Sequence, residues 1–78
     1  MISAEVSLYP VETLDSDRVI TESLQALNDH QLQYDIGSLS TQIHGEPDHV
    51  WSALRSLHER AQALGNEVVM VVTISNGT

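Results

Sequence analysis

The sequence predicts an α+β fold in which two helices cover one face of a four-stranded antiparallel sheet. Three observations indicate it. Two segments have apolar residues at the 3.6-residue spacing of an amphipathic helix, four segments alternate in polarity or are rich in β-branched residues, and the six occur in the order βαββαβ. With 78 residues, the chain is predicted to form a single domain over residues 1–78 with a thin core.

The first predicted strand is Ile2–Pro10, where apolar and polar side chains alternate. Side chains of a strand point alternately to its two faces, so every second residue, beginning with Ile2, is expected to face the core. The opposite face then carries Ser3, Glu5, Ser7 and Tyr9. Glu5 is the unusual member of this set because it is the only acidic residue within the strand.

Both predicted helices carry a capping residue and an apolar stripe. The first lies within residues 15–30, with Asp15, Ser16 and Asp17 as N-cap candidates. Its apolar residues are Val19, Ile20, Leu24 and Leu27. The second begins at Pro47 and ends before Gly65. Its stripe is formed by Val50, Ala53, Leu54, Leu57, Ala61 and Leu64.

The remaining strands are predicted at residues 32–36, 39–44 and 67–76, and a tight turn at Gly37 and Ser38 joins the first two of these. Right-handed crossovers would place both helices on the same face of the antiparallel sheet, which is the ferredoxin-like arrangement. The other face of the sheet is left without a covering layer.

Eight side chains from the two long strands are expected on this uncovered face. They are Ser3, Glu5, Ser7, Tyr9, Val69, Val71, Thr73 and Ser75. This mixture is too apolar for a solvated surface and too polar for a dry core. It therefore predicts that a second copy of the chain covers the face, in a homodimer or a higher homo-oligomer.

Composition excludes several classes of function. Three arginines, no lysine and eleven acidic residues give a formal charge of −8, which repels nucleic acids and anionic membranes. No segment resembles a signal peptide or a membrane span, so a cytoplasmic protein is expected. The four histidines have no metal-binding spacing and no catalytic or dinucleotide motif is present, so we expect no metal, no cofactor and no enzymatic activity.

Three segments together resemble a known family. They are SAEVSLYP near the start, STQIHGEPDHVWSALRSLHERA in the middle and VVMVVTISNG at the end. They are similar to the YkoF-type members of the thiamine-binding protein family. The resemblance implies a ferredoxin-like domain that binds thiamine or its hydroxymethylpyrimidine moiety without catalysis. YkoF itself resembles two such domains in tandem, so the resemblance implies that a chain with one domain would form the equivalent unit as a homodimer.

The candidate ligand-binding residues centre on Glu5. A carboxylate can meet the amino group and ring nitrogen of an aminopyrimidine with two hydrogen bonds if a proton is shared with the ring nitrogen. The Ser7 hydroxyl lies two residues away on the same face. Tyr9 could form a stacking wall and Thr73 belongs to the same face of the last strand. The alternative for Glu5 is a solvent-exposed residue or an interface ion pair.

The contribution of the third strand depends on its register. Ser40, Gln42 and His44 occupy one face, and Thr41 and Ile43 occupy the other. The pattern leaves both registers open; the family resemblance favours Thr41 near the site, and His44 is a further candidate contact.

The favoured function is a small-molecule binding protein for thiamine or hydroxymethylpyrimidine at a homodimer sheet interface. The alternative is a ferredoxin-like dimerisation or regulatory module without a small-molecule ligand. An enzyme of unknown reaction has no support in the motifs.

Overall fold

The computed structural model describes residues 1–11, 15–29, 32–64 and 67–77. Within these residues the chain forms four strands and two α-helices in the predicted order. They are β1 (Ile2–Val11), α1 (Ser16–Leu24), β2 (Gln33–Ile36), β3 (Thr41–Gly45), α2 (Pro47–Leu64) and β4 (Glu67–Ser75). A short 3-10 helix, η1 (Gln25–Asp29), directly follows α1.

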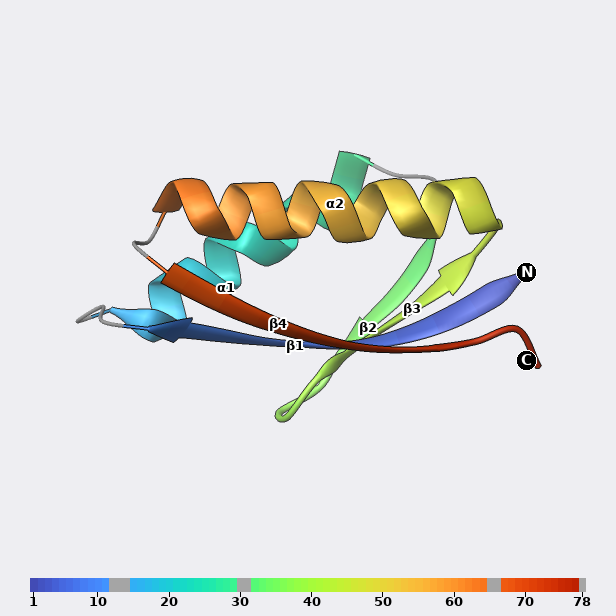
Figure 1. Ribbon diagram of the computed structural model, residues 1–78, viewed down its shortest axis with the longest axis horizontal. Coiled ribbons are helices and arrows are strands. Elements are labelled where there is room, and N and C mark those ends of the chain that lie inside the picture. The colour runs from blue at the N-terminus through green and yellow to red at the C-terminus, as the bar shows by residue number, and fades with distance from the viewer. Residues whose placement is uncertain (12–14, 30–31, 65–66, 78) are drawn as a thin grey trace.

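The sheet has the strand order β2-β3-β1-β4, and all neighbouring strands are antiparallel. Both helices lie on one side of the sheet, above it in Figure 1, and the other side is open. The predicted ferredoxin-like α+β fold is therefore confirmed. β1 pairs with β4 along almost its whole length, from Ser3 to Val11, but with β3 only from Ile2 to Val6, so the ends of β1 and β4 extend beyond β3 as a two-stranded ribbon.

The helices start where the capping residues predict. Asp15 is the N-cap of α1, and its carboxylate accepts a hydrogen bond from the backbone N–H of Arg18 at 3.4 Å. α2 begins at Pro47. Proline suits this position because an N–H in the first turn has no hydrogen-bond partner within the helix. The first helical segment differs from the prediction because it changes to 3-10 geometry at Gln25. The predicted helix stop at Gly65 lies outside the described residues.

The connection between β2 and β3 is longer than the predicted turn. The backbone N–H of Gly37 donates to the carbonyl of Ser40 at 2.9 Å, so residues 37–40 form the connection and β3 begins at Thr41 instead of Leu39. A Cβ atom at position 37 would lie 3.0 Å from the same carbonyl oxygen. This close approach explains why glycine suits the position.

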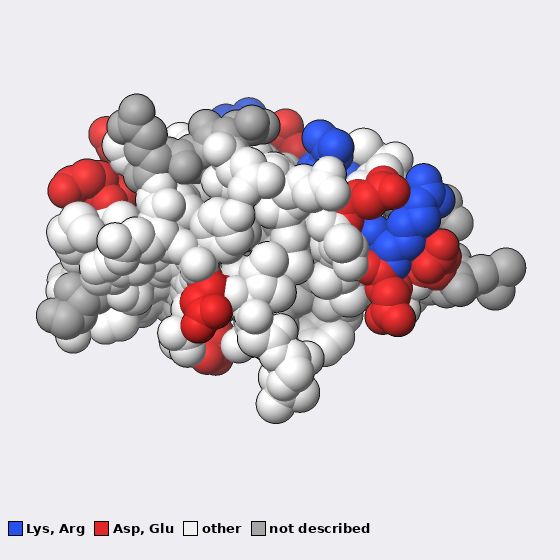
Figure 2. Space-filling view, turned by 180° about the vertical axis from the view of Figure 1, so that it is seen from behind, with Lys and Arg blue, Asp and Glu red and all other residues white. Residues whose placement is uncertain are grey.

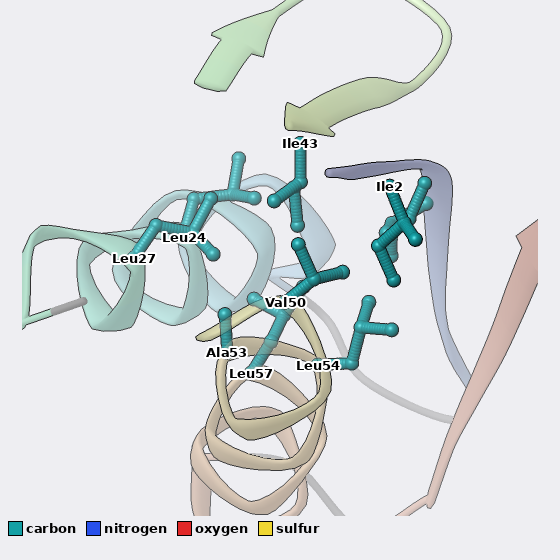
Figure 3. Packing of buried hydrophobic residues seen from close by; sticks show 10 residues of the cluster. Ile2, Leu24, Leu27, Ile43, Val50, Ala53, Leu54 and Leu57 are labelled. Carbon is teal, nitrogen blue, oxygen red and sulfur yellow. The ribbon is translucent and has the colours of Figure 1, made fainter. Parts of the chain in front are cut away.

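The core lies between the helices and the covered face of the sheet. Figure 3 shows Ile2 and Ile43 on the sheet and the side chains of α2 converging from opposite sides. Five of the six residues of the predicted stripe are buried, and Leu64 at its end is half-buried. The buried ones are Val50, Ala53, Leu54, Leu57 and Ala61. Burying such side chains removes apolar area from water, and this fixes which face of each strand is left open.

Candidate functional site

The open face of the sheet carries two adjacent rows of polar side chains. Residues opposite each other in neighbouring strands point to the same face, so the pairing register defines each row. In the order β4, β1, β3, β2, the first row is Thr73, Glu5, Gln42 and Asp35. The second row is Ser75, Ser3, His44 and Gln33. We call these eight residues the polar rows.

The polar rows line a hollow of about 630 Å³. All eight contribute to it, and its volume falls within the range of about 300 to 1,000 Å³ that is typical of small-molecule sites. Most of the lining side chains are exposed in the single chain, whereas Ser3 and His44 are half-buried. The hollow is therefore large enough for a drug-sized ligand and open on one side.

A hydrogen bond across β1 and β3 orients one edge of the hollow. The Ser3 hydroxyl and His44 Nδ1 are 2.7 Å apart. When Nδ1 is the unprotonated nitrogen, the Ser3 hydroxyl donates to it and Nε2 carries the ring proton. In that tautomer Nε2–H is left as a hydrogen-bond donor.

Glu5 occupies the middle of the open face. Gln42 on β3 and Thr73 on β4 are its direct cross-strand neighbours. Within the described ranges, no hydrogen bond or ion pair engages the Glu5 carboxylate, and the side chain is exposed. The carboxylate is thus available to accept hydrogen bonds from a ligand.

The positive charges of the chain lie in the other layer. Arg18 is on α1, and Arg55 and Arg60 are on α2. Two of the three form ion pairs within their own helix, Arg18 with Glu22 at 3.0 Å and Arg55 with Glu59 at 2.8 Å. Figure 2, the view from behind, shows basic atoms in the upper part of the molecule and toward one end, next to acidic atoms, while the acidic atoms at the lower middle lie among uncharged residues.

Comparisons with known proteins place the chain in a family. The model of the YkoF-related family matches residues 1–78. The chain belongs to this family. No curated protein matches the sequence.

Solved structures show the same fold at low sequence identity. A Streptococcus pneumoniae protein aligns with a TM-score of 0.91 and 22% identity over 99% of this chain and 87% of its own. A Methanocaldococcus jannaschii protein aligns with a TM-score of 0.88 and 18% identity over 99% of this chain and 80% of its own. A Thermotoga maritima protein provisionally assigned to thiamine biosynthesis or salvage aligns with a TM-score of 0.82 and 17% identity, covering 95% and 81% of the two chains.

Three of the six residues expected at the site in this family member line the hollow together. They are Glu5, His44 and Thr73. Ser7 and Tyr9 share the open face but lie beyond the polar rows, opposite Val71 and Val69 of β4. The Ser7 hydroxyl is 3.5 Å from the Leu39 carbonyl oxygen, a long contact.

Thr41, which the family resemblance favours near the site, does not lie on the same face as Glu5. Thr41 pairs with Val6, a core residue, so its side chain points to the helix-covered face, where it is 5% exposed. The observed register instead puts Gln42 and His44 on the Glu5 face. Within the STQIHG segment, Gln42 and His44 therefore line the hollow, whereas the side chain of Thr41 points away from it.

The sequence prediction did not include Gln33 or Asp35 in the site. Both reach the hollow because β2 pairs with β3, which sets Gln33 opposite His44 and Asp35 opposite Gln42. The alternation of β2 sets the polar Gln33 and Asp35 on one face and the apolar Tyr34 and Ile36 on the other. It does not say which residues of β3 they lie opposite, and the pairing supplies that information.

Two other kinds of feature are absent from the described residues. No group of three or more His, Cys, Asp or Glu side chains in this part of the chain is arranged to hold a metal ion. No helix in the same part is long and apolar enough to cross a membrane.

Proposed function

We propose that this protein binds thiamine or its hydroxymethylpyrimidine moiety in the hollow on the open face of the sheet, and that a second copy of the chain covers the bound ligand. The observation that carries the proposal is the position of Glu5, an exposed carboxylate in the middle of a polar hollow in a YkoF-related chain. The thiamine-related assignment of a structural neighbour points to the same ligand class. Recognition without catalysis is the proposed role.

The side chains of the hollow suit an aminopyrimidine. Its amino group donates hydrogen bonds and its ring nitrogens accept them, so a carboxylate, an amide and hydroxyls complement its edge. Glu5 would accept from the amino group and share a proton with the neighbouring ring nitrogen. Gln42 and Thr73, its cross-strand neighbours, supply an amide and a hydroxyl on either side.

A homodimer would enclose the ligand. Beyond the polar rows, the open face becomes apolar, and Tyr9, Val69 and Val71 are 54%, 43% and 52% exposed. Apolar side chains exposed side by side are typical of a protein interface. A partner packed there would also shield the hollow from water, which strengthens hydrogen bonds to the ligand.

Calorimetric titration of the purified protein with thiamine and with hydroxymethylpyrimidine tests the proposal. We expect both to bind and Glu5→Gln to weaken both about 10-fold or more, since a hydrogen bond to a charged group contributes roughly 1.5 to 3 kcal/mol. Thr41→Val is the control: it changes a hydroxyl on the covered face and should leave the affinity unchanged. Absence of binding by either compound contradicts the proposed function, whereas binding that Glu5→Gln leaves intact contradicts only the role of Glu5.

The apolar end of the open face also favours a second candidate. A chain that uses the face only for self-association would be a dimerisation or regulatory module without a ligand. The same titrations separate the two functions, because such a module would form the dimer and bind neither compound.

A further inference from the structure

We propose that the hollow selects a ligand that is cationic and unphosphorylated, and that Asp35 is the residue that recognises the positive charge. This inference rests on the proposed function and names the specificity of the same site. It concerns a residue on the edge strand β2 for which the sequence pattern suggests no role.

The geometry places two carboxylates on one row, with an amide between them. Glu5 pairs with Gln42, and Gln42 pairs with Asp35. Neighbouring strands are about 4.8 Å apart, so the backbones of Glu5 and Asp35 are separated by roughly 10 Å. Both side chains line the hollow. A ligand of two linked rings can therefore contact one carboxylate with each ring.

The charge of the hollow has one sign. Glu5 and Asp35 are the carboxylates among the described residues that line it, and none of these lining residues is a lysine or an arginine. The three arginines belong to the helices of the opposite layer. A positive ligand group is therefore attracted to the hollow, and a phosphate group is repelled by two carboxylates with no basic side chain to offset them.

Thiamine, hydroxymethylpyrimidine and thiamine diphosphate differ in the charge of the group that would lie near Asp35. Thiamine joins a neutral aminopyrimidine to a cationic thiazolium through one methylene group, hydroxymethylpyrimidine lacks the cation, and thiamine diphosphate adds negative charge. With the aminopyrimidine on Glu5, the thiazolium extends across Gln42 toward Asp35. The expected order of affinity is thiamine first, followed by hydroxymethylpyrimidine, with thiamine diphosphate binding more weakly than thiamine.

Titration of three proteins with these three compounds tests the inference. In the wild-type protein, thiamine should bind more tightly than hydroxymethylpyrimidine. Asp35→Asn should weaken thiamine binding on the order of fivefold, the effect of one opposite charge at about 4 Å in water, and leave hydroxymethylpyrimidine unchanged. Asp17→Asn removes the same charge from the first turn of α1, in the helix layer, and should change neither affinity.

Salt provides an independent measurement. Raising the ionic strength from about 0.01 to 0.15 M shortens the screening length from roughly 30 to 8 Å. Thiamine affinity should fall in the wild-type protein and fall less in Asp35→Asn, while hydroxymethylpyrimidine affinity stays constant.

The outcomes separate this inference from the proposed function. If neither compound binds the wild-type protein, the proposed function fails. If both bind and Asp35→Asn weakens them equally, or weakens neither, the role of Asp35 is overturned while the function stands. Tighter binding of thiamine diphosphate than of thiamine would overturn the selection against phosphorylated ligands.

Discussion

The contact between Ser3 and His44 orients the imidazole ring at one edge of the hollow. An imidazole ring without a partner rotates and exchanges tautomers, whereas a hydroxyl 2.7 Å from Nδ1 favours one orientation. The two residues are 41 positions apart in the chain and are brought together only by the pairing of β1 with β3. A fixed donor at Nε2 would add directional specificity beside the acceptor carboxylate of Glu5.

Removal of the Ser3 hydroxyl should release the histidine ring. We expect Ser3→Ala to shift the ¹⁵N resonances of the His44 ring toward a mixture of the two neutral tautomers, because the hydrogen bond that favours Nε2–H is lost. Nitrogen-detected NMR of the imidazole measures this ratio. Ser7→Ala is the matched control, since that hydroxyl is near the Leu39 carbonyl and not the ring. Identical ring spectra in all three proteins would show that Ser3 does not set the tautomer.

At the scale of elements, α2 holds the sheet in place. Its stripe packs against β1 and β3, and Leu57 in the middle of the stripe is fully buried. Because the helix covers one face only, the packing that stabilises the fold also determines that Glu5 and its row are exposed on the other face.

Truncation of Leu57 tests this dependence. Leu57→Ala should lower the free energy of unfolding by about 2 to 5 kcal/mol, through lost burial and the cavity left behind. Leu39→Ala is the same chemical change at a side chain that is 89% exposed, and it should cost less than about 0.5 kcal/mol. Urea unfolding, monitored by circular dichroism, measures the free energy of unfolding of both variants. Similar midpoints for both variants would contradict the assigned core.

The elements and their buried faces could be predicted because the spacing of apolar residues in the sequence differs between strands and helices. The alternation in β1 and the stripe of α2 each identify a buried side, since a strand repeats every two residues and a helix every 3.6. The spacing of apolar residues does not determine the register between neighbouring strands. Whether Thr41 or Gln42 faces Glu5, and whether Asp35 reaches the same row, depends on which residues pair, and a shift of one residue reverses every side chain.

At the scale of the whole molecule, the open face has two parts that differ in polarity. The polar rows lie where four strands are paired, and the apolar part, with Tyr9, Val69 and Val71, lies where only β1 and β4 continue. A ligand can be held by the first part alone, but the second part remains in contact with water unless another protein covers it. Under the proposed function, ligand binding would use the polar rows and self-association would use the apolar part.

A charge in the apolar part should therefore weaken self-association. We expect Val71→Lys to raise the dissociation constant of the dimer about 10- to 100-fold, or roughly 1.4 to 2.8 kcal/mol, because the two-fold symmetry of a dimer places the change in both copies. Ser52→Lys adds the same charge to an exposed position of α2, in the other layer, and should leave the constant unchanged. Sedimentation velocity over a dilution series measures the dissociation constant of each variant. A wild-type protein that stays monomeric at high concentration would contradict the dimer, and equal effects of the two lysines would show that self-association uses a different surface.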